Sequence, residues 1–92
     1  MLEIVMSNRF KKDLRLAARR GYNFDLLDEI VNKLTRRELL PEKNKDHALS
    51  GDFEGCRECH IAPDWLLVYQ VNDRELILYL MRTGTHSDLF NR

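Results

Sequence analysis

Histidine occurs at three positions in this chain, His47, His60 and His86. Two of them lie in the segments HIAPDW (residues 60–65) and RTGTH (residues 82–86), which also contain Asp64 and Arg82. Histidine can give or take a proton near neutral pH, and a carboxylate or guanidinium beside it can orient it or stabilise charge. These five residues therefore predict a site for acid-base chemistry.

The first half of the chain contains the elements on which such a site would be built. Leu2 to Met6 is a short apolar run that predicts a strand. Apolar residues at helical spacing predict a first helix over Asn8 to Arg20, with Ser7 as N-cap and Gly21 as the stop. A second helix is expected from Asn23 or Asp25 to about Arg37, and its apolar stripe, like that of the first helix, needs a sheet to cover.

The second half provides that sheet. Strands are predicted over residues 56–61, 65–71 and 76–81, separated by turns at Pro63-Asp64 and Asn72-Asp73. Residues 42–46 are predicted to be a loop that carries His47, and Thr85 to Phe90 a final turn of helix. The pattern predicts an α+β fold, with an N-terminal strand and two helices packed on a mainly antiparallel sheet, as one domain over residues 1–92.

Composition narrows the class of protein. The 92 residues are 43% hydrophobic, and no run of eighteen apolar residues or basic-apolar leader is present. We therefore expect a cytoplasmic protein that does not enter the membrane. The formal charge of zero is divided unevenly, because residues 1–45 carry eleven Lys and Arg against seven acids, and residues 46–92 carry four against eight.

Cys56 and Cys59, followed by His60, match the spacing of haem attachment and the C-x-x-C of zinc and redox sites. Residues three apart on a strand point to opposite faces, so the two thiols cannot converge on one ligand. The chain has no other cysteine to complete a zinc site. We expect two small strand residues and no cofactor or metal.

Three segments together carry a resemblance to a known family. They are KDHALSG at residues 45–51, CHIAPDWLLVY at 59–69 and RTGTHSDLF at 82–90, in this order and spacing. The chain resembles the YafQ branch of the RelE/ParE toxin superfamily. The resemblance implies a RelE-like fold and a bacterial type II toxin that enters the A site of the 70S ribosome and cuts mRNA. It also implies a cognate antitoxin that silences the toxin, and operator DNA bound only through the antitoxin complex.

The family's site residues can be carried over to matching positions. The resemblance implies catalytic roles for His47, His60, Asp64 and His86, with Arg82, Trp65 and Phe90 at the phosphate or substrate. Cleavage by the RNA's own 2′-OH needs a base, an acid and positive charge, which histidines and one arginine can supply without a metal. His86, just beyond a strand end, is our first choice for proton transfer, and the base and acid stay unassigned.

Other interpretations stay open at this point. For Trp65 and Phe90 packing is the favoured role, and Arg82 could pair with Asp64. A ParE-like gyrase inhibitor would have no need of three placed histidines, which argues against that alternative. A silent member that only binds its antitoxin and operator DNA is harder to reject, because the acidic half carrying the site favours weak binding of free RNA. Weak binding of free RNA also predicts that cleavage depends on the ribosome.

Overall fold

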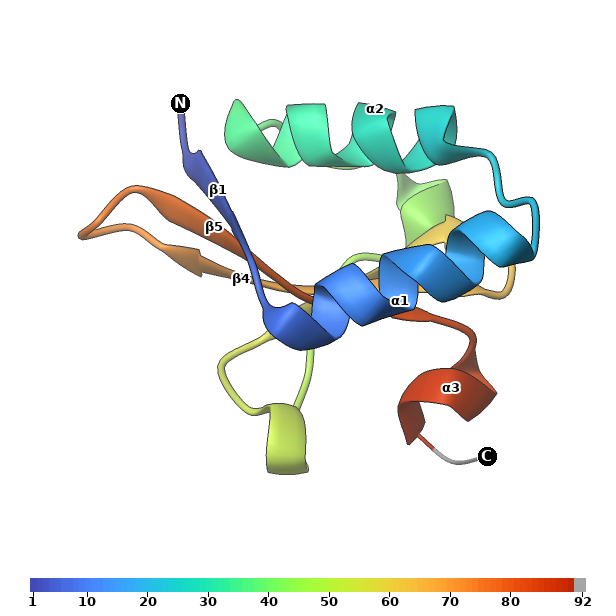
Figure 1. Cartoon of the computed structure of the whole chain (residues 1–92). Helices are drawn as coiled ribbons and strands as arrows, with labels where there is room; N and C mark the ends of the chain where they lie inside the picture. The colour runs from blue at the N-terminus through green and yellow to red at the C-terminus, as the bar shows by residue number, and fades with distance from the viewer. Residues whose placement is uncertain (91–92) are drawn as a thin grey trace.

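The computed structural model describes residues 1–90, and within them one sheet has the strand order β1-β5-β4-β3-β2 (Figure 1). The strands are β1 (Glu3–Met6), β2 (His47–Ala48), β3 (Arg57–Ala62), β4 (Trp65–Asn72) and β5 (Ile77–Gly84). β1 pairs with β5 in parallel, and the other pairs are antiparallel. The predicted α+β class and mainly antiparallel sheet are confirmed.

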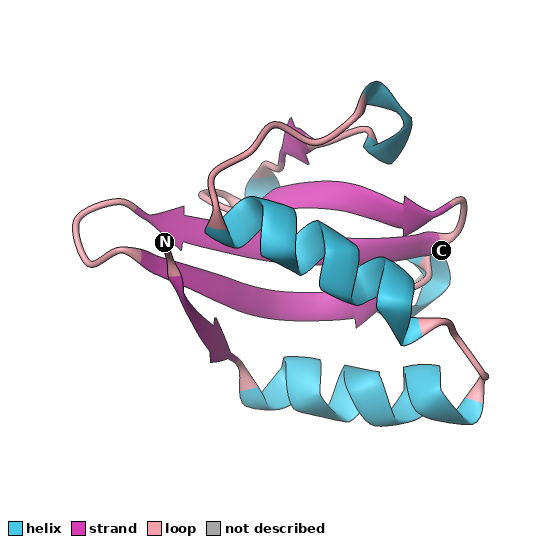
Figure 2. Cartoon of the chain, turned by 90° about the horizontal axis from the view of Figure 1, so that it is seen from above, coloured by secondary structure: helices cyan, strands magenta, loops and turns pink. Residues whose placement is uncertain are grey.

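Both predicted helices form with the expected caps. In α1 (Asn8–Arg19) the Ser7 hydroxyl accepts from the amide of Phe10, and in α2 (Phe24–Thr35) Asn23 caps the amide of Asp25. Such side chains satisfy amides that the first turn leaves unpaired. α2 crosses one face of the sheet, whereas α1 runs beside β5 at the sheet's edge (Figure 2). Within residues 1–90 no helix is long and apolar enough to cross a membrane.

The apolar run of β4 is buried on both sides, because each face of the sheet has its own cluster of side chains. Trp65, Leu67 and Tyr69 alternate toward the helices, where they join Phe10 and Ile30. Leu66 and Val68 point to the other face, where the smaller cluster also contains Cys56, Leu89 and the half-buried Leu49, Phe53, Met81 and Phe90. This second face is covered only by short elements.

Those elements are the 3-10 turn η2 (Gly51–Phe53) and α3 (His86–Phe90), which lie on the side of the sheet opposite α2 (Figure 1). The predicted C-terminal helical turn is thus confirmed, with Leu89 buried against the sheet. α3 is brief, and its first residue, His86, is exposed at the end of this face, which we call the open face.

Several predicted boundaries are wrong, each for a local reason. β5 continues to Gly84, so Arg82 lies inside the strand, because pairing with β4 extends beyond the apolar run. His47 is on the short strand β2, because it pairs with Glu58 of β3, and residues 42–44 form the 3-10 turn η1 (Glu42–Asn44). α2 ends at Thr35, since Arg37 adopts a left-handed φ of 58°.

Candidate active site

His60 and His86 come together on the open face of the sheet. His60 is on β3 and His86 is the first residue of α3, and their ring centroids are 5.8 Å apart in an edge-to-face arrangement. A register shift between His60 and Ala62 marks the point where β3 bends into the tight turn at Pro63. The sequence prediction that these two histidines share one site is consistent with this geometry.

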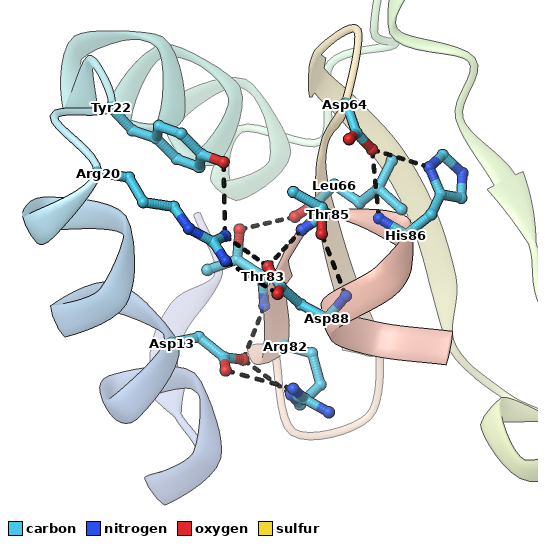
Figure 3. A network of polar contacts seen from close by, with 10 residues as sticks. All are labelled: Asp13, Arg20, Tyr22, Asp64, Leu66, Arg82, Thr83, Thr85, His86 and Asp88. Carbon is cyan, nitrogen blue, oxygen red and sulfur yellow. Dashed lines mark hydrogen bonds and ion pairs between the residues drawn. The ribbon is translucent and has the colours of Figure 1, made fainter. Parts of the chain in front are cut away.

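Asp64, on that turn, holds His86 through two contacts (Figure 3). Its Oδ1 lies 3.1 Å from the Nδ1 of His86 and accepts from the backbone amide of the same residue at 3.3 Å. The ring contact, and then the amide, stabilise the charged carboxylate and lower the pKa of Asp64 below its usual value. With Nδ1 engaged, the Nε2 of His86 is the nitrogen left for a substrate.

The position of His86 is fixed by a second set of contacts at the start of α3. Asp88 accepts two bonds from the Arg20 guanidinium, at 2.6 and 3.0 Å, and one from the amide of Thr85 at 2.9 Å (Figure 3). The Arg20 bond lowers the pKa of Asp88 well below its ordinary range. Gly84, at a φ of 155°, has no Cβ, and one there would lie 2.8 Å from a carboxylate oxygen of Asp88. Arg20, Asp88 and Gly84 therefore anchor the turn that presents His86.

Glu58 is a site residue that the sequence reasoning missed. Glu58 is only 4% exposed, and its carboxylate lies 3.5 Å from the Nε2 of His47 on the neighbouring strand β2. The Nδ1 of His47 faces the carbonyl oxygen of Lys45 at 2.7 Å. Potential metal-ligating atoms of Glu58, His60 and His86 all lie within 4.8 Å of one another. Glu58 thus links His47 to the other two histidines, and its place two residues before His60 on one strand face was the available signal.

Arg82 pairs with Asp13, and not with Asp64 as the sequence suggested. Its Nε and Nη2 donate to the Asp13 carboxylate of α1 at 2.8 and 3.3 Å, and Asp13 also accepts from the amide of Thr83 at 3.0 Å. The suggested pairing of Arg82 with Asp64 is wrong, because β5 runs on beside α1 and Asp13 meets the guanidinium there (Figure 3). A role for Arg82 at the phosphate stays a prediction.

Trp65 and Phe90 lie on opposite faces of the sheet. Trp65 is 4% exposed in the core under the helices, with Tyr22 at a centroid distance of 4.9 Å and Phe24 at 6.2 Å. Phe90 is half-buried on the open face, 5.6 Å from the Phe53 ring and 6.4 Å from that of His86. Packing accounts for Trp65, whereas Phe90 forms an apolar flank of the histidine pair.

The cysteines lie on different faces, as predicted. Cys59 belongs to the cluster under the helices and Cys56 to the cluster on the open face. Burial raises the pKa of the Cys59 thiol to about 12, and it raises that of Cys56 as well. Both thiols are therefore protonated at neutral pH and poorly suited to nucleophilic attack or metal binding.

The open face thus places two imidazoles, a surface carboxylate and a buried carboxylate around one point. Such a set can take a proton from one substrate atom and give a proton to another. A five-stranded sheet with two N-terminal helices and a short C-terminal helix is the architecture of RelE-like toxins, and solved structures share it at high similarity.

Residues 2–91 match a family model described as the bacterial toxin of type II toxin-antitoxin system, YafQ. The chain belongs to this family. It is 38% identical over 89 residues to the mRNA interferase toxin YafQ of Escherichia coli K12, an alignment covering 96% of this chain and 95% of the relative.

Two solved structures extend the comparison. A metal-bound toxin from Helicobacter pylori has a TM-score of 0.92 and 44% identity, covering 98% of this chain and all of the other. The toxin in the E. coli DinJ-YafQ toxin-antitoxin complex has a TM-score of 0.87 and 37% identity, with 97% of each chain covered. The fold that the sequence resemblance implied is confirmed by these structures.

Proposed function

We propose that this toxin is an endoribonuclease that cleaves mRNA, as the name of its E. coli relative states for that protein. The observation that supports this most is the histidine pair at 5.8 Å, with His86 oriented by Asp64 through its Nδ1. Two proton carriers so close together can serve the two oxygens of one phosphodiester. A protein that only blocked gyrase or only bound its antitoxin would have no need of that arrangement.

The proposed reaction is attack of the 2′-OH on the adjacent phosphorus. One imidazole takes the 2′-OH proton, the 5′-oxygen leaves with a proton from the other, and a 2′,3′-cyclic phosphate forms. Asp64 holds His86 in one orientation, and Glu58 lies between His47 and the histidine pair. Since these side chains can supply both proton transfers, we propose that the chemical step requires no metal.

We further propose that the ribosome presents the message. In the half of the chain that carries the histidines, Arg57 pairs with Asp46 at 3.3 Å and Arg82 with Asp13 at 2.8 Å. The charge of these two arginines is already compensated, so this half of the chain adds little free positive charge of its own to hold a free strand. α1 instead exposes Arg9, Lys11, Lys12, Arg15 and Arg19, none with an ion pair among residues 1–90, and this basic face of α1 could contact ribosomal RNA. Docking would then orient a message that the site cannot hold alone.

A cognate antitoxin is the second proposed partner. The E. coli relative has been solved in a toxin-antitoxin complex. We propose that an acidic antitoxin segment folds onto the basic face of α1, and that operator DNA is bound only through this complex. An antitoxin segment that covered the histidines directly would silence the toxin equally well.

The H. pylori relative is metal-bound, and the donors here fit a metal too. One carboxylate and two imidazoles, from Glu58, His60 and His86, suit Zn²⁺ or Cu²⁺. Because a bound ion would occupy the imidazole lone pairs, we propose that it inhibits cleavage.

Calorimetric titration with Cu²⁺ should show one site in the wild type and a weaker one in Glu58→Gln. Equal binding by both proteins would remove Glu58 from the ligand set.

A cleavage time course tests the proposed function. One labelled message is incubated with wild type or with folded His86→Ala, in the presence or absence of programmed ribosomes. We expect fast cleavage only by the wild type on ribosomes, with a 2′,3′-cyclic phosphate product. Equal rates with and without ribosomes would refute the ribosome dependence, and equal rates for the two proteins would refute the role of His86.

A further inference from the structure

A pocket of about 350 Å³ lies next to His60, outside the contacts described so far. It is bounded by residues 43–45, from η1 and the residue after it, and by residues 60–63, at the end of β3. His60 is thus shared between the pocket and the histidine pair. A strand of RNA whose scissile phosphate sits between His60 and His86 would have a neighbouring nucleotide beside this pocket.

Asn44, which lines the pocket, has a buried acceptor without a partner. Asn44 is 5% exposed and its Nδ2 donates to the carbonyl oxygen of His60 at 2.7 Å. That bond fixes the orientation of the amide, because a flipped side chain would point its oxygen at another oxygen. The Asn44 Oδ1 has no hydrogen-bond partner within residues 1–90. A buried acceptor in this state is unfavourable, and a ligand N–H donor would satisfy it once the side chains that cover the oxygen move aside.

The same pocket carries two positive charges. Lys43 and Lys45 are exposed, and neither makes an ion pair within the part of the chain that the structure describes. Lys45 adopts a left-handed φ of 48°, unusual for a residue with a side chain, which places it at the pocket while its carbonyl meets the His47 ring. Both lysines belong to the basic half, residues 1–45, and they place unpaired positive charge next to His60 of the acidic half.

We propose that this pocket binds one nucleotide of the message next to the scissile phosphate. The ammonium groups of Lys43 and Lys45 contact its phosphate, and an N–H on the edge of its base donates to the Asn44 Oδ1. The proposal rests on the proposed ribonuclease function, since it concerns the same substrate. It assigns Asn44 a second role besides holding the backbone of His60.

Nuclear magnetic resonance on the full-length toxin, labelled with ¹⁵N, tests this without cleavage. The probe is adenosine 3′-monophosphate, compared with purine riboside 3′-monophosphate, whose base has no N–H donor, and with inorganic phosphate. We expect saturable amide shifts at residues 43–45 and 60–63. The purine riboside should bind roughly threefold to tenfold more weakly, the effect of one lost hydrogen bond, and phosphate more weakly still.

The variant Lys45→Asn removes one charge and keeps a residue that tolerates the left-handed backbone. It should weaken binding roughly fivefold to tenfold, whereas Arg74→Asn, in the exposed β4–β5 turn, should leave it unchanged.

Equal binding of both nucleotides, equal binding of phosphate, or shifts confined to other residues would overturn the proposal. If wild type cleaves on ribosomes but shows no such shifts, the pocket assignment fails and the function stands. If the shifts occur but the wild type does not cleave, the pocket binds a nucleotide and the ribonuclease function fails.

Discussion

His86 and Asp64 form the most specific contact of the site at the scale of single residues. The carboxylate engages both the ring and the backbone amide of His86, although its side chain is two-thirds exposed. An exposed ion pair contributes little to stability, so its value here is orientation. With Nδ1 held, the reactive nitrogen has one direction to face.

The pKa of Asp64 should report this contact directly. It is lowered because the charged form accepts both bonds, the ring bond being the larger cause. His86→Ala removes the ring bond and keeps the amide, so the pKa should rise part of the way toward its ordinary value. A carboxyl ¹³C titration of both proteins measures the shift. An Asp64 midpoint that does not move would show that the ring contact is absent in solution.

Part of the site could be predicted from residue types, whereas contacts between residues far apart in the sequence could not. The histidines and Asp64 could be predicted because few other side chains move protons near neutrality. The pairing of Arg82 with Asp13 joins residues 69 apart, and no local pattern points to it. In the sequence, Glu58 looks like any acidic residue of a strand. Only the pairing of β3 with β2 places it beside His47.

At the scale of elements, α3 is the part on which the site depends most. It has only five residues, so it cannot be stable alone, and it is held by the Arg20–Asp88 pair and by Leu89 in the apolar cluster. The chain therefore uses a contact to Arg20, the residue that caps the end of α1, to present a residue of the site. This makes the position of His86 sensitive to changes on a distant helix.

Asp88→Asn keeps the shape of the side chain and removes its charge. We expect a loss of about 1 kcal/mol in the free energy of unfolding at neutral pH, and slower cleavage through a displaced His86. The lowered pKa of Asp88 sets the sign of the pH dependence. The contribution is complete above the unfolded pKa of about 3.9 and disappears as the pH falls toward the folded value.

Thermal unfolding of wild type and variant from neutral pH to about pH 2 measures that difference. Asp73→Asn is the matched control, because its ion pair with Arg37 is largely exposed and should contribute little. A difference between wild type and Asp88→Asn that grows on acidification would contradict the assigned role.

The elements themselves were the easiest feature to predict. Helical spacing and caps at Ser7 and Asn23 indicated α1 and α2, and the apolar run from Trp65 indicated a strand buried on both faces. Their ends were less predictable, because β5 ends where its ladder with β4 ends and not where Met81 closes the apolar run. Pairing between strands is a property of the fold, so the short β2 left no signal in the sequence.

On the scale of the whole molecule, charge and chemistry occupy different surfaces. α1 presents exposed cations at the edge of the sheet, and the histidines lie on β2, on β3 and at the start of α3. One surface can thus bind a large anionic partner while the other meets the substrate. The antitoxin and ribosomal RNA would then compete for the same cations.

Charge reversal on α1 tests the antitoxin part of this division. Arg15→Glu with Arg19→Glu should weaken the antitoxin complex by roughly tenfold, and low salt should restore more of the lost affinity. Arg20 is unsuited to this test, because it anchors α3 through Asp88. Arg74→Glu is the control for a change of charge elsewhere. Affinity that is unchanged in the α1 variant would show that the basic face is only solvated.

The central claim is that His60 and His86 act together in one cleavage step. Single-turnover cleavage of one message on programmed ribosomes should be measured for His60→Ala, His86→Ala and the double variant, each shown to be folded. Each single change should lower the rate by about a hundredfold to ten-thousandfold, and the double variant should be little slower than the slower single one, because the two residues serve the same reaction. Single variants that cleave at the wild-type rate, or losses that multiply in the double variant, would contradict the account.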